Sequence, residues 1–372
     1  VTVEAGKSQD VSVLITRVAA MTCTRGPMTQ PRLFATATPL PDGRVLVAGG
    51  FFEVAVDGTC AGCRVYQATP TAEIYDPFKG TFEPVGDLNR ARGLHRAARL
   101  GDGRVLLIGG AGQLQFNPLG TPFPLSPTQH AVTIEIFDPA SGEFAAGPDD
   151  PGVARVFHTA TELNDGRVLI AGGGTAVSAS DAKRDSAICQ AAGDSVTCEP
   201  GPSLVYHRLG HTATLLADGR VFFWGGGTDA GDGANACNVA AVTQCPEWFV
   251  PEQNVFVAVD ANNPINGASP QSNLFFATAT RLGSYGVLIA GGALRQSATG
   301  ELSFSEPTQS AFLYAPASNV IGNSLSQAVG AFQLRQPRML LASQPLALEG
   351  RAFFAGGYSD LAFTPAEDLE LF

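Results

Sequence analysis

The sequence predicts an all-β fold, a β-propeller of six four-stranded antiparallel blades, and three observations support this. A ten-residue phrase, typified by "NDGRVLIAGG" at 164–173, occurs six times, and its closing glycines fall at 50, 110, 173, 226, 292 and 357. Steps of 53 to 66 residues are typical of propeller blades or solenoid repeats. The composition, with 43 Gly, 25 Pro and only 15% charged residues, suits short strands joined by tight turns. With 45% apolar residues the chain can also bury a large core.

The first half of each repeated unit is a predicted hairpin. An alternating run such as "HTATLLA" (211–217) precedes an Asp-Gly or Glu-Gly pair, which supplies the positive φ of a two-residue turn. The run that follows, such as "RVLVA" (44–48), is nearly all apolar, as expected of a strand covered on both faces. The Gly-Gly pair ends the strand, where backbone approaches backbone or takes a conformation closed to other residues.

The second half of each unit is a second predicted hairpin. Segments such as "EIYDPFKGTFEPV" (73–85) and "EIFDPASGEFAAG" (135–147) place a D-P-x-x-G turn between two strands, because Pro presets φ and Gly takes the left-handed position. A four-stranded sheet with two apolar faces cannot bury them alone. The units are therefore expected to stack side by side around an axis.

Several of these motifs carry a family resemblance. An aromatic residue before Asp-Pro is followed seven residues later by a second one, as in Tyr75 and Phe82, and an Arg-x-x-His precedes the first strand, as in Arg155 to His158. In these features the chain resembles kelch repeats from about Arg32 onward. The sequence of its repeated motif is similar to that of exported bacterial kelch-repeat proteins, surface lipoproteins included. The resemblance implies a kelch-type propeller at the cell surface. Two units depart from the pattern: the third has cysteines in place of the aromatics, and the fifth lacks Asp-Gly.

The two ends of the chain are expected to complete the ring together. Residues 366–372, "AEDLELF", match a third strand, so the last blade lacks its outermost strand. Residues 10–18, "DVSVLITRV", have strand character and are expected to supply it, closing the ring without an open sheet edge. The same spacing along the sequence aligns Asn273 of the fifth unit with Arg32 of the first. The propeller would span 10–372, with 1–9 an extension or the remnant of an upstream domain; the alternative is that the whole N-terminal segment is a detached tail.

Six of the seven cysteines form local pairs in loop-rich sequence, which favours disulfides in an exported protein. The pairs are Cys60 with Cys63, Cys189 with Cys198 and Cys237 with Cys245, and Cys23 remains over or exchanges with the first pair. A zinc site is the competing interpretation of the C-x-x-C, but it needs a second pair of ligands at defined spacing. We expect no metal there.

Charge and hydropathy exclude some classes of function. A net charge of −11 argues against a nucleic-acid partner. No run of 18 apolar residues exists, so no membrane span is expected. No basic and apolar leader region follows Val1, so any signal peptide is expected to have been removed already. The expected location is secreted, periplasmic or at the cell surface, with an upstream lipid anchor left open.

The blade topology predicts two unlike faces. The Asp-Gly and Asp-Pro turns share one, here called the short-turn face. The connections between second and third strands and between units share the other, the long-loop face. These connections are long and different from one another, and variable loops on a rigid scaffold are where binding residues gather. They are 51–70, 111–131, 174–185, 228–246, 293–309, 260–272 and 322–336. The alternative is that they serve no purpose beyond oligomer contacts.

Equivalent arginine and histidine residues in three consecutive units are the candidate binding residues. Each His lies seven residues before a turn Asp, and each Arg lies three residues before the His. The functional interpretation is a metal held by imidazoles or an anion clamped by guanidinium groups. The alternative is a repeat signature in which each pair satisfies its own backbone. The residues are Arg92, His95, Arg155, His158, Arg208 and His211.

The predicted function is a binding or structural-interaction module that uses the long-loop face, with a protein or a glycan at the cell surface as partner. The alternative is a carbohydrate-active enzyme, a kelch-type isomerase, lyase or oxidase, on the same face. No catalytic residue is assigned: the five histidines do not suit a galactose oxidase-like copper site, and no Walker, G-x-S-x-G or H-E-x-x-H motif occurs. No cofactor is expected. Calcium at the carboxylate-rich 229–235 is weighed against turn formation by the same residues.

Overall fold

The structure is a computed structural model of the 372-residue chain. Every element within the described residues is a β-strand. The structure describes residues 27–54, 63–116, 125–131, 133–149, 155–176, 181–226, 246–258, 274–283, 286–295, 304–316, 320–322, 333–340, 342–345, 352–355, 358–359 and 370–371.

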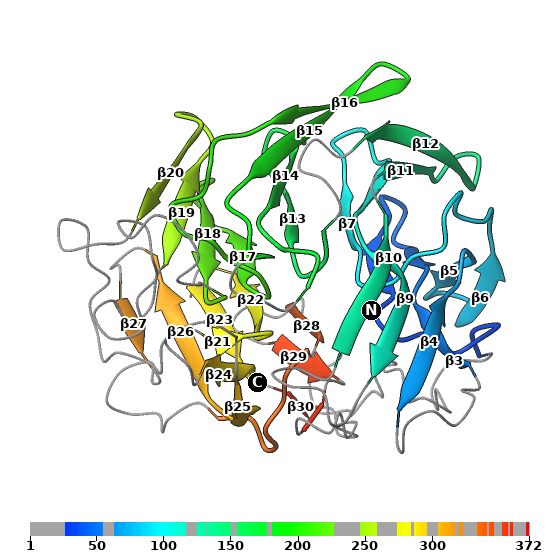
Figure 1. The fold of residues 1–372 in the computed structure, drawn as a ribbon. Coiled ribbons are helices and arrows are strands. Elements are labelled where there is room, and N and C mark those ends of the chain that lie inside the picture. Colours follow the sequence, from blue (N-terminus) through cyan, green and yellow to red (C-terminus); the bar gives the residue numbers. More distant parts are fainter. Residues whose placement is uncertain are drawn as a thin grey trace.

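Each of the first five units folds into a four-stranded antiparallel sheet whose order follows the chain, an arrangement consistent with a β-propeller (Figure 1). The first unit has β1 (Thr36–Pro39), β2 (Val45–Ala48), β5 (Ala72–Asp76) and β6 (Thr81–Pro84). The second has β7 (Arg96–Arg99), β8 (Val105–Ile108), β11 (Thr133–Asp138) and β12 (Glu143–Asp149). The third has β13 (Thr159–Glu162), β14 (Val168–Ala171), β15 (Ser186–Ala192) and β16 (Ser195–Pro200). The fourth has β17 (Thr212–Leu215), β18 (Val221–Trp224), β19 (Glu247–Val250) and β20 (Val255–Ala258). The fifth has β22 (Thr278–Leu282), β23 (Gly286–Ala290), β26 (Ala311–Ala315) and β27 (Val320–Gly322).

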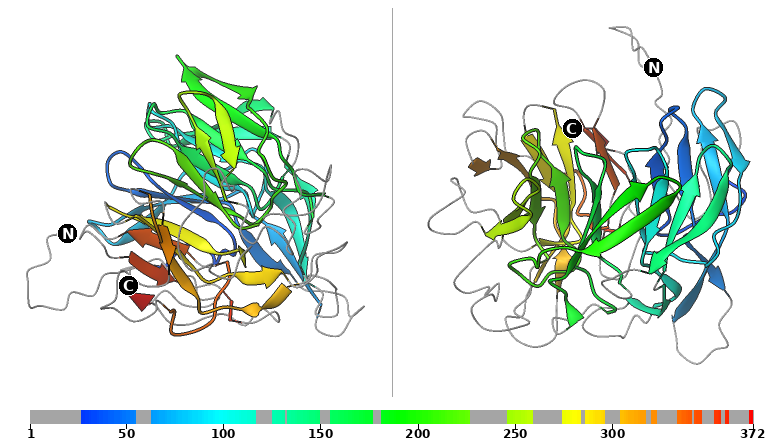
Figure 2. Two further views of the ribbon diagram at one scale, coloured as in Figure 1. Left: turned by 90° about the vertical axis from the view of Figure 1, so that its left-hand side faces the viewer. Right: turned by 90° about the horizontal axis from the view of Figure 1, so that it is seen from above.

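The hydrophobic core lies between neighbouring sheets. The second strands of the second, third and fourth units are covered on both faces, as predicted: all four residues of β8, β14 and β18 are buried. One cluster joins Leu106 and Ile108 of the second unit to Val168 and Ile170 of the third, and equivalent clusters join the first unit to the second, the third to the fourth and the fourth to the fifth. Seen from above, the sheet of the first unit lies on one side of the molecule and that of the fifth unit on the other (Figure 2, right). A sheet apolar on both faces is thereby buried on both faces, the physical reason for the repeat.

Two more sheets form where the sequence analysis expected only loops. After its Gly-Gly pair, the first unit makes the hairpin β3 (Phe51–Val54) and β4 (Arg64–Ala68), and the second makes β9 (Ala111–Phe116) and β10 (Leu125–His130). β4 pairs with β9, so the hairpins of two units form one sheet in the order β10-β9-β4-β3. The fifth unit contributes the sheet of β21 (Leu274–Phe275), β24 (Ala293–Arg295) and β25 (Phe304–Pro307).

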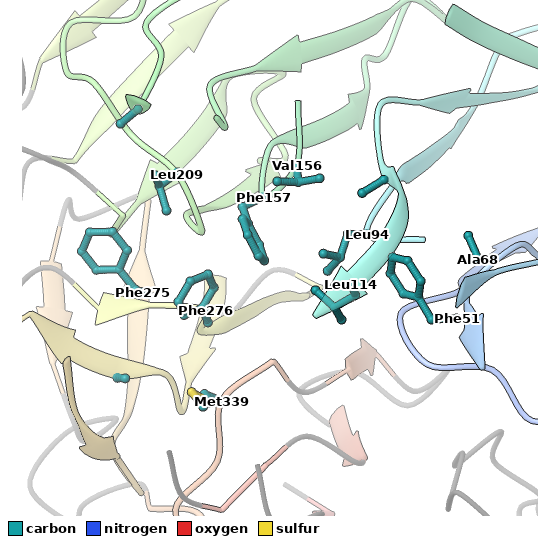
Figure 3. Packing of buried hydrophobic residues seen from close by; sticks show 13 residues of the cluster. Phe51, Ala68, Leu94, Leu114, Val156, Phe157, Leu209, Phe275, Phe276 and Met339 are labelled. Atoms are coloured by element: carbon teal, nitrogen blue, oxygen red, sulfur yellow. The ribbon is translucent and has the colours of Figure 1, made fainter. Parts of the chain in front are cut away.

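An apolar cluster, here called the axial cluster, lies where the innermost strands begin (Figure 3). The residue just before the His position has a positive φ in every unit: 54–59° for Phe34, Leu94, Phe157, Phe276 and Leu340, and 62° for Gly210. Phe157 and Phe276 meet edge to face with ring centroids 5.3 Å apart. The left-handed conformation is uncommon for residues with a Cβ and is held here by the surrounding structure.

The sixth unit contributes β28 (Ala342–Pro345), β29 (Ala352–Ala355) and β30 (Glu370–Leu371), paired in that order. β30 confirms the predicted third strand within 366–372. Tyr358 of this unit contacts Phe34 of the first, with ring centroids 6.2 Å apart, so the first and last units lie side by side at the axial cluster. Residues 10–18, the predicted closing strand, lie outside the described residues.

Candidate functional site

The three predicted arginines are buried at the junctions between units. The side chains of Arg92, Arg155 and Arg208 are each 0% exposed. Arg92 donates through Nη1 to the carbonyl oxygens of Gly109 (3.1 Å) and Thr133 (2.9 Å), and through Nη2 to a carboxylate oxygen of Glu135 (2.6 Å). Its guanidinium is therefore occupied by the protein's own acceptors.

In each of the first four units the arginine binds a carboxylate on the third strand or just before it, and the position of that carboxylate varies. Arg32 pairs with Glu73 at 2.8 Å and Arg208 with Glu247 at 2.6 Å, both at the same register position. In the third unit this position holds an alanine, and Asp185, two residues earlier, supplies the carboxylate to Arg155 at 2.6 Å.

Glu247 illustrates how the pair overcomes burial. Desolvation raises the pKa of its carboxyl group, while Arg208 and the backbone N–H of Val205 at 2.7 Å favour the charged form. An ion pair buried this deeply is stable only because further hydrogen bonds satisfy the carboxylate.

The fifth unit lacks both partners of this ion pair. The carbonyl oxygen of Leu274 accepts a hydrogen bond from the N–H of Gly226, as that of Arg92 accepts one from the N–H of Gly50. Leu274 therefore occupies the arginine position. The alignment of Asn273 with Arg32 was wrong by one residue. The glutamate position is occupied by Phe312, opposite Ile289. Both charges are replaced by apolar groups together.

Two of the three histidines bond the preceding unit. Nε2 of His95 is 2.9 Å from Oγ1 of Thr36, and Nε2 of His211 is 3.0 Å from Oγ1 of Thr159. Both are pairs between neighbouring innermost strands. His95 and His211 therefore hold adjacent sheets in register.

His158 faces an arginine where the other two face a threonine. Arg96 holds the threonine position in the second unit and donates through Nε to the carbonyl oxygen of His158 at 3.0 Å. Both ring nitrogens of His158 are buried without a hydrogen-bond partner among the described residues. Burial and then the charges of Arg155 and Arg96 hold the pKa of His158 well below its usual range.

The same physical causes act on the other two rings. Burial and then Arg92 lower the pKa of His95 to about 3, and burial and then Arg208 hold that of His211 well below its usual range. A neutral imidazole could ligate a metal, yet within the described ranges no three His, Cys, Asp or Glu side chains gather as a metal site would require. The backbone carbonyl of each arginine accepts a hydrogen bond from the preceding unit, and the arginine side chain donates hydrogen bonds within its own unit.

The carboxylates were missed by the sequence analysis, although a signal was present. A glutamate stands two residues before an aromatic residue of the third strand in three units, as Glu73, Glu135 and Glu247. In the sixth unit Glu370 pairs in register with Phe354, the position that Glu73 takes opposite Val47.

On the long-loop face, the β10-β9-β4-β3 sheet has an apolar side and a polar side. Phe51, Ala68 and Leu114 belong to the axial cluster, which fixes the inner side of the sheet. Residues of the opposite parity stand in register on the outer side: Gln67 lies between Phe52 and Gln113. This outer side, here called the amide face, is half-buried to exposed, and the side chains that the structure describes on it are uncharged. Its residues are Phe52, Val54, Val65, Gln67, Gln113, Gln115 and Thr128.

Hydrogen bonds hold the amide groups of this face in place. Gln67 Nε2 donates to the carbonyl oxygen of Gly112 at 3.1 Å, and Thr128 Oγ1 donates to Oε1 of Gln113 at 3.3 Å. Gln115 is exposed, and its Nε2 is 3.5 Å from the same Oε1. The face thus presents fixed amide and hydroxyl groups beside an aromatic ring.

The predicted cysteine pairs are described only in part. Cys189 and Cys198 are disulfide-bonded across β15 and β16, with Cα atoms 4.1 Å apart in direct register. Cys63, at the start of β4, is also disulfide-bonded, and its partner lies outside the described residues, as do Cys23, Cys60, Cys237 and Cys245. The proposed calcium segment 229–235 lies outside them too.

Comparison with known proteins shows a likeness of fold only. No family model matches the chain, and no curated protein matches it. Among solved structures it is similar to one described as "Structure of YjhT", at 13% identity and a TM-score of 0.48, over 94% of this chain and 83% of that one. Across the described ranges, no helix has the length and apolar character to cross a membrane.

Proposed function

We propose that this chain is an exported binding module built on a six-bladed, kelch-type propeller, and that its long-loop face binds a cell-surface partner. The observation that carries the proposal is the pairing of β4 with β9, which joins loops of two units into one sheet. Residues 10–18 complete the last blade in this proposal.

The chemistry of the amide face favours a glycan over a protein as that partner. Gln67, Gln113 and Thr128 offer neutral donors and acceptors, and Phe52 offers an apolar ring for the flat side of a sugar. A face without charge gives no steering to a charged partner. A sheet packed on an apolar cluster also makes a broad surface rather than a deep catalytic cleft, which supports binding over catalysis.

A glycan array read beside a panel of cell-surface proteins tests the proposal. We expect neutral glycans to bind and the double variant Gln67→Ala, Gln115→Ala to lose at least about ten-fold in affinity, because hydrogen-bonding groups are removed from a polar contact. Gln253→Ala, an exposed glutamine on the β19–β20 turn, is the matched control and should bind as the parent does. Equal binding by all three chains would contradict the amide face as the site.

Mild reduction tests the contribution of the disulfide at Cys63, beside β4. We expect weaker binding after reduction, because the hairpin that carries the amide face loses a covalent restraint. Unchanged binding after verified reduction would show that the restraint is not needed. Turnover of a bound glycan would instead support the enzyme alternative.

A further inference from the structure

The innermost strands of the first three units leave a cavity of about 260 Å³ at their turn ends, on the face opposite the amide face. Pro39, Arg99 and Glu162 are the last residues of β1, β7 and β13, directly before the short turns. Small side chains line most of its walls: Ala37, Ala97, Ala98 and Ala160. The axial cluster, which includes Leu94 and Phe157, lies at the other ends of the same strands.

Arg99 differs from the other arginines of this face. The turn arginines Arg44, Arg104 and Arg167 each donate through Nε to the aspartate two residues before them, at 2.6–2.8 Å. Arg99 has one contact among the described residues, Nη2 to Glu162 at 3.5 Å, the outer limit of a hydrogen bond. Within the part of the chain that the structure describes, its remaining N–H donors have no hydrogen-bond acceptor, and both side chains are about one third exposed, at 35% and 38%.

We propose that this cavity binds a small carboxylic acid that also carries a hydroxyl or amino group. A guanidinium binds a carboxylate through two parallel N–H donors, which Arg99 has available. Glu162, beside it, accepts a hydrogen bond from the second group of the ligand. The volume lies just below the usual range of ligand pockets, which limits the ligand to a small molecule.

Matched small molecules test the two halves of this recognition on the full chain by ligand-observed NMR titration. Lactate carries both groups, propionate lacks the hydroxyl and lactamide lacks the charge. We expect the order lactate, propionate, lactamide in affinity, with binding of lactate weakened by added salt because the site is open to solvent. No binding of lactate at millimolar concentration, or equal binding of lactamide, would overturn the proposal.

Variants assign the binding to the cavity. We expect Arg99→Gln to lower the affinity for lactate at least about ten-fold, since a charge-assisted pair is lost. Glu162→Gln should change the preference for lactate over propionate, and Ala97→Leu should block both ligands by filling the cavity. Arg44→Gln, whose side chain is 34% exposed on the same face, is the control and should bind as the parent does. Thermal unfolding of each variant checks folding, and lactate binding by a folded Arg99→Gln equal to the parent would contradict the proposal.

Discussion

In the first four units, the first glycine of the Gly-Gly pair has no room for a side chain. Gly109 has φ +62°, and a Cβ there would overlap the backbone oxygen of Arg155, which also accepts the N–H of Gly110 at 2.9 Å. We expect Gly109→Ala to destabilise the protein by about 3 kcal/mol, from backbone strain and from separation of two sheets. Denaturant unfolding midpoints at unchanged m-value measure it.

Gly193 supplies the control for this prediction. Its φ is +60°, and nothing lies within 4 Å of the position of its Cβ. Gly193→Ala should therefore destabilise the protein only through backbone strain, by about 1 kcal/mol. Equal effects of the two substitutions would contradict the close approach at Gly109.

The buried histidines should make stability depend on pH. The pKa of His95 is lowered to about 3 by burial and then by Arg92 and Arg96, whereas the unfolded chain titrates near 6.5. Since only the unfolded state gains the proton between these values, the stabilisation is complete above pH 6.5 and declines as the pH falls. We expect His95 to account for about 2 kcal/mol of the loss between pH 7 and pH 5. Urea unfolding of the parent and of His95→Asn at both pH values measures it.

Thr36→Val separates the titration of His95 from its hydrogen bond. This variant loses the 2.9 Å contact but keeps the buried ring, so it should be less stable at both pH values with a similar pH dependence. A parent and His95→Asn that lose stability equally from pH 7 to pH 5 would show that the ring is not held neutral.

The elements that depend on one unit were predictable, and those that depend on two were not. The doubly buried strand at 168–171 and the bonded hairpin of Cys189 and Cys198 follow from local pattern. The pairing of β4 with β9 joins segments more than forty residues apart in sequence, and neither segment contains a signal for its partner. The sequence analysis therefore predicted both segments only as parts of long loops.

The candidate site shows the same division. The equivalence of His95, His158 and His211 was visible in the repeat, but their burial and their threonine partners in the preceding unit depend on how neighbouring sheets pack. The cavity beside Arg99 arises from three strands at once, and no single segment predicts it.

The two residues of the buried ion pair should be energetically coupled, so that losing one costs more than losing both. The pair of Arg92 and Glu135 is nearly inaccessible, and the fifth unit replaces both positions with Leu274 and Phe312. We expect Arg92→Leu or Glu135→Phe alone to cost about 3–5 kcal/mol, because each leaves a buried charge unpaired, and the double variant to recover much of that loss. A double-mutant cycle measures the coupling, expected at about 2 kcal/mol or more.

The exposed pair of Arg44 and Asp42 is the control for this cycle. Its Nε to Oδ2 distance is also 2.6 Å, but both side chains reach solvent, so alanine substitutions should couple by less than about 1 kcal/mol. Equal coupling energies at the two pairs would contradict the argument that burial couples the two residues.

At the scale of the molecule, the units are linked by backbone bonds around the axial cluster. Leu94 donates to Phe34 at 3.2 Å, Gly210 to Phe157 at 2.8 Å and Phe276 to Gly210 at 2.7 Å. Leu340 donates to Phe276 at 2.8 Å as well, so these bonds join the first unit to the second and the third through to the sixth, and Phe34 contacts Tyr358 of the sixth. They give a reason for the recurring positive φ: at Phe34, Phe157, Gly210 and Phe276 the carbonyl accepts from the next unit.

The proposal that residues 10–18 complete the sixth sheet makes the last prediction. An unpaired β30 would leave a row of unsatisfied backbone groups at the edge of that sheet, next to the first unit. We therefore expect deletion of residues 1–18 to lower the thermal unfolding temperature and to speed hydrogen exchange in β29 and β30 by about ten-fold or more, since these strands open more often without their neighbour. Deletion of residues 1–9 is the control and should change neither. If both truncated chains unfold and exchange as the parent does, the N-terminal segment pairs with nothing in this sheet, and the last unit must be stabilised in another way.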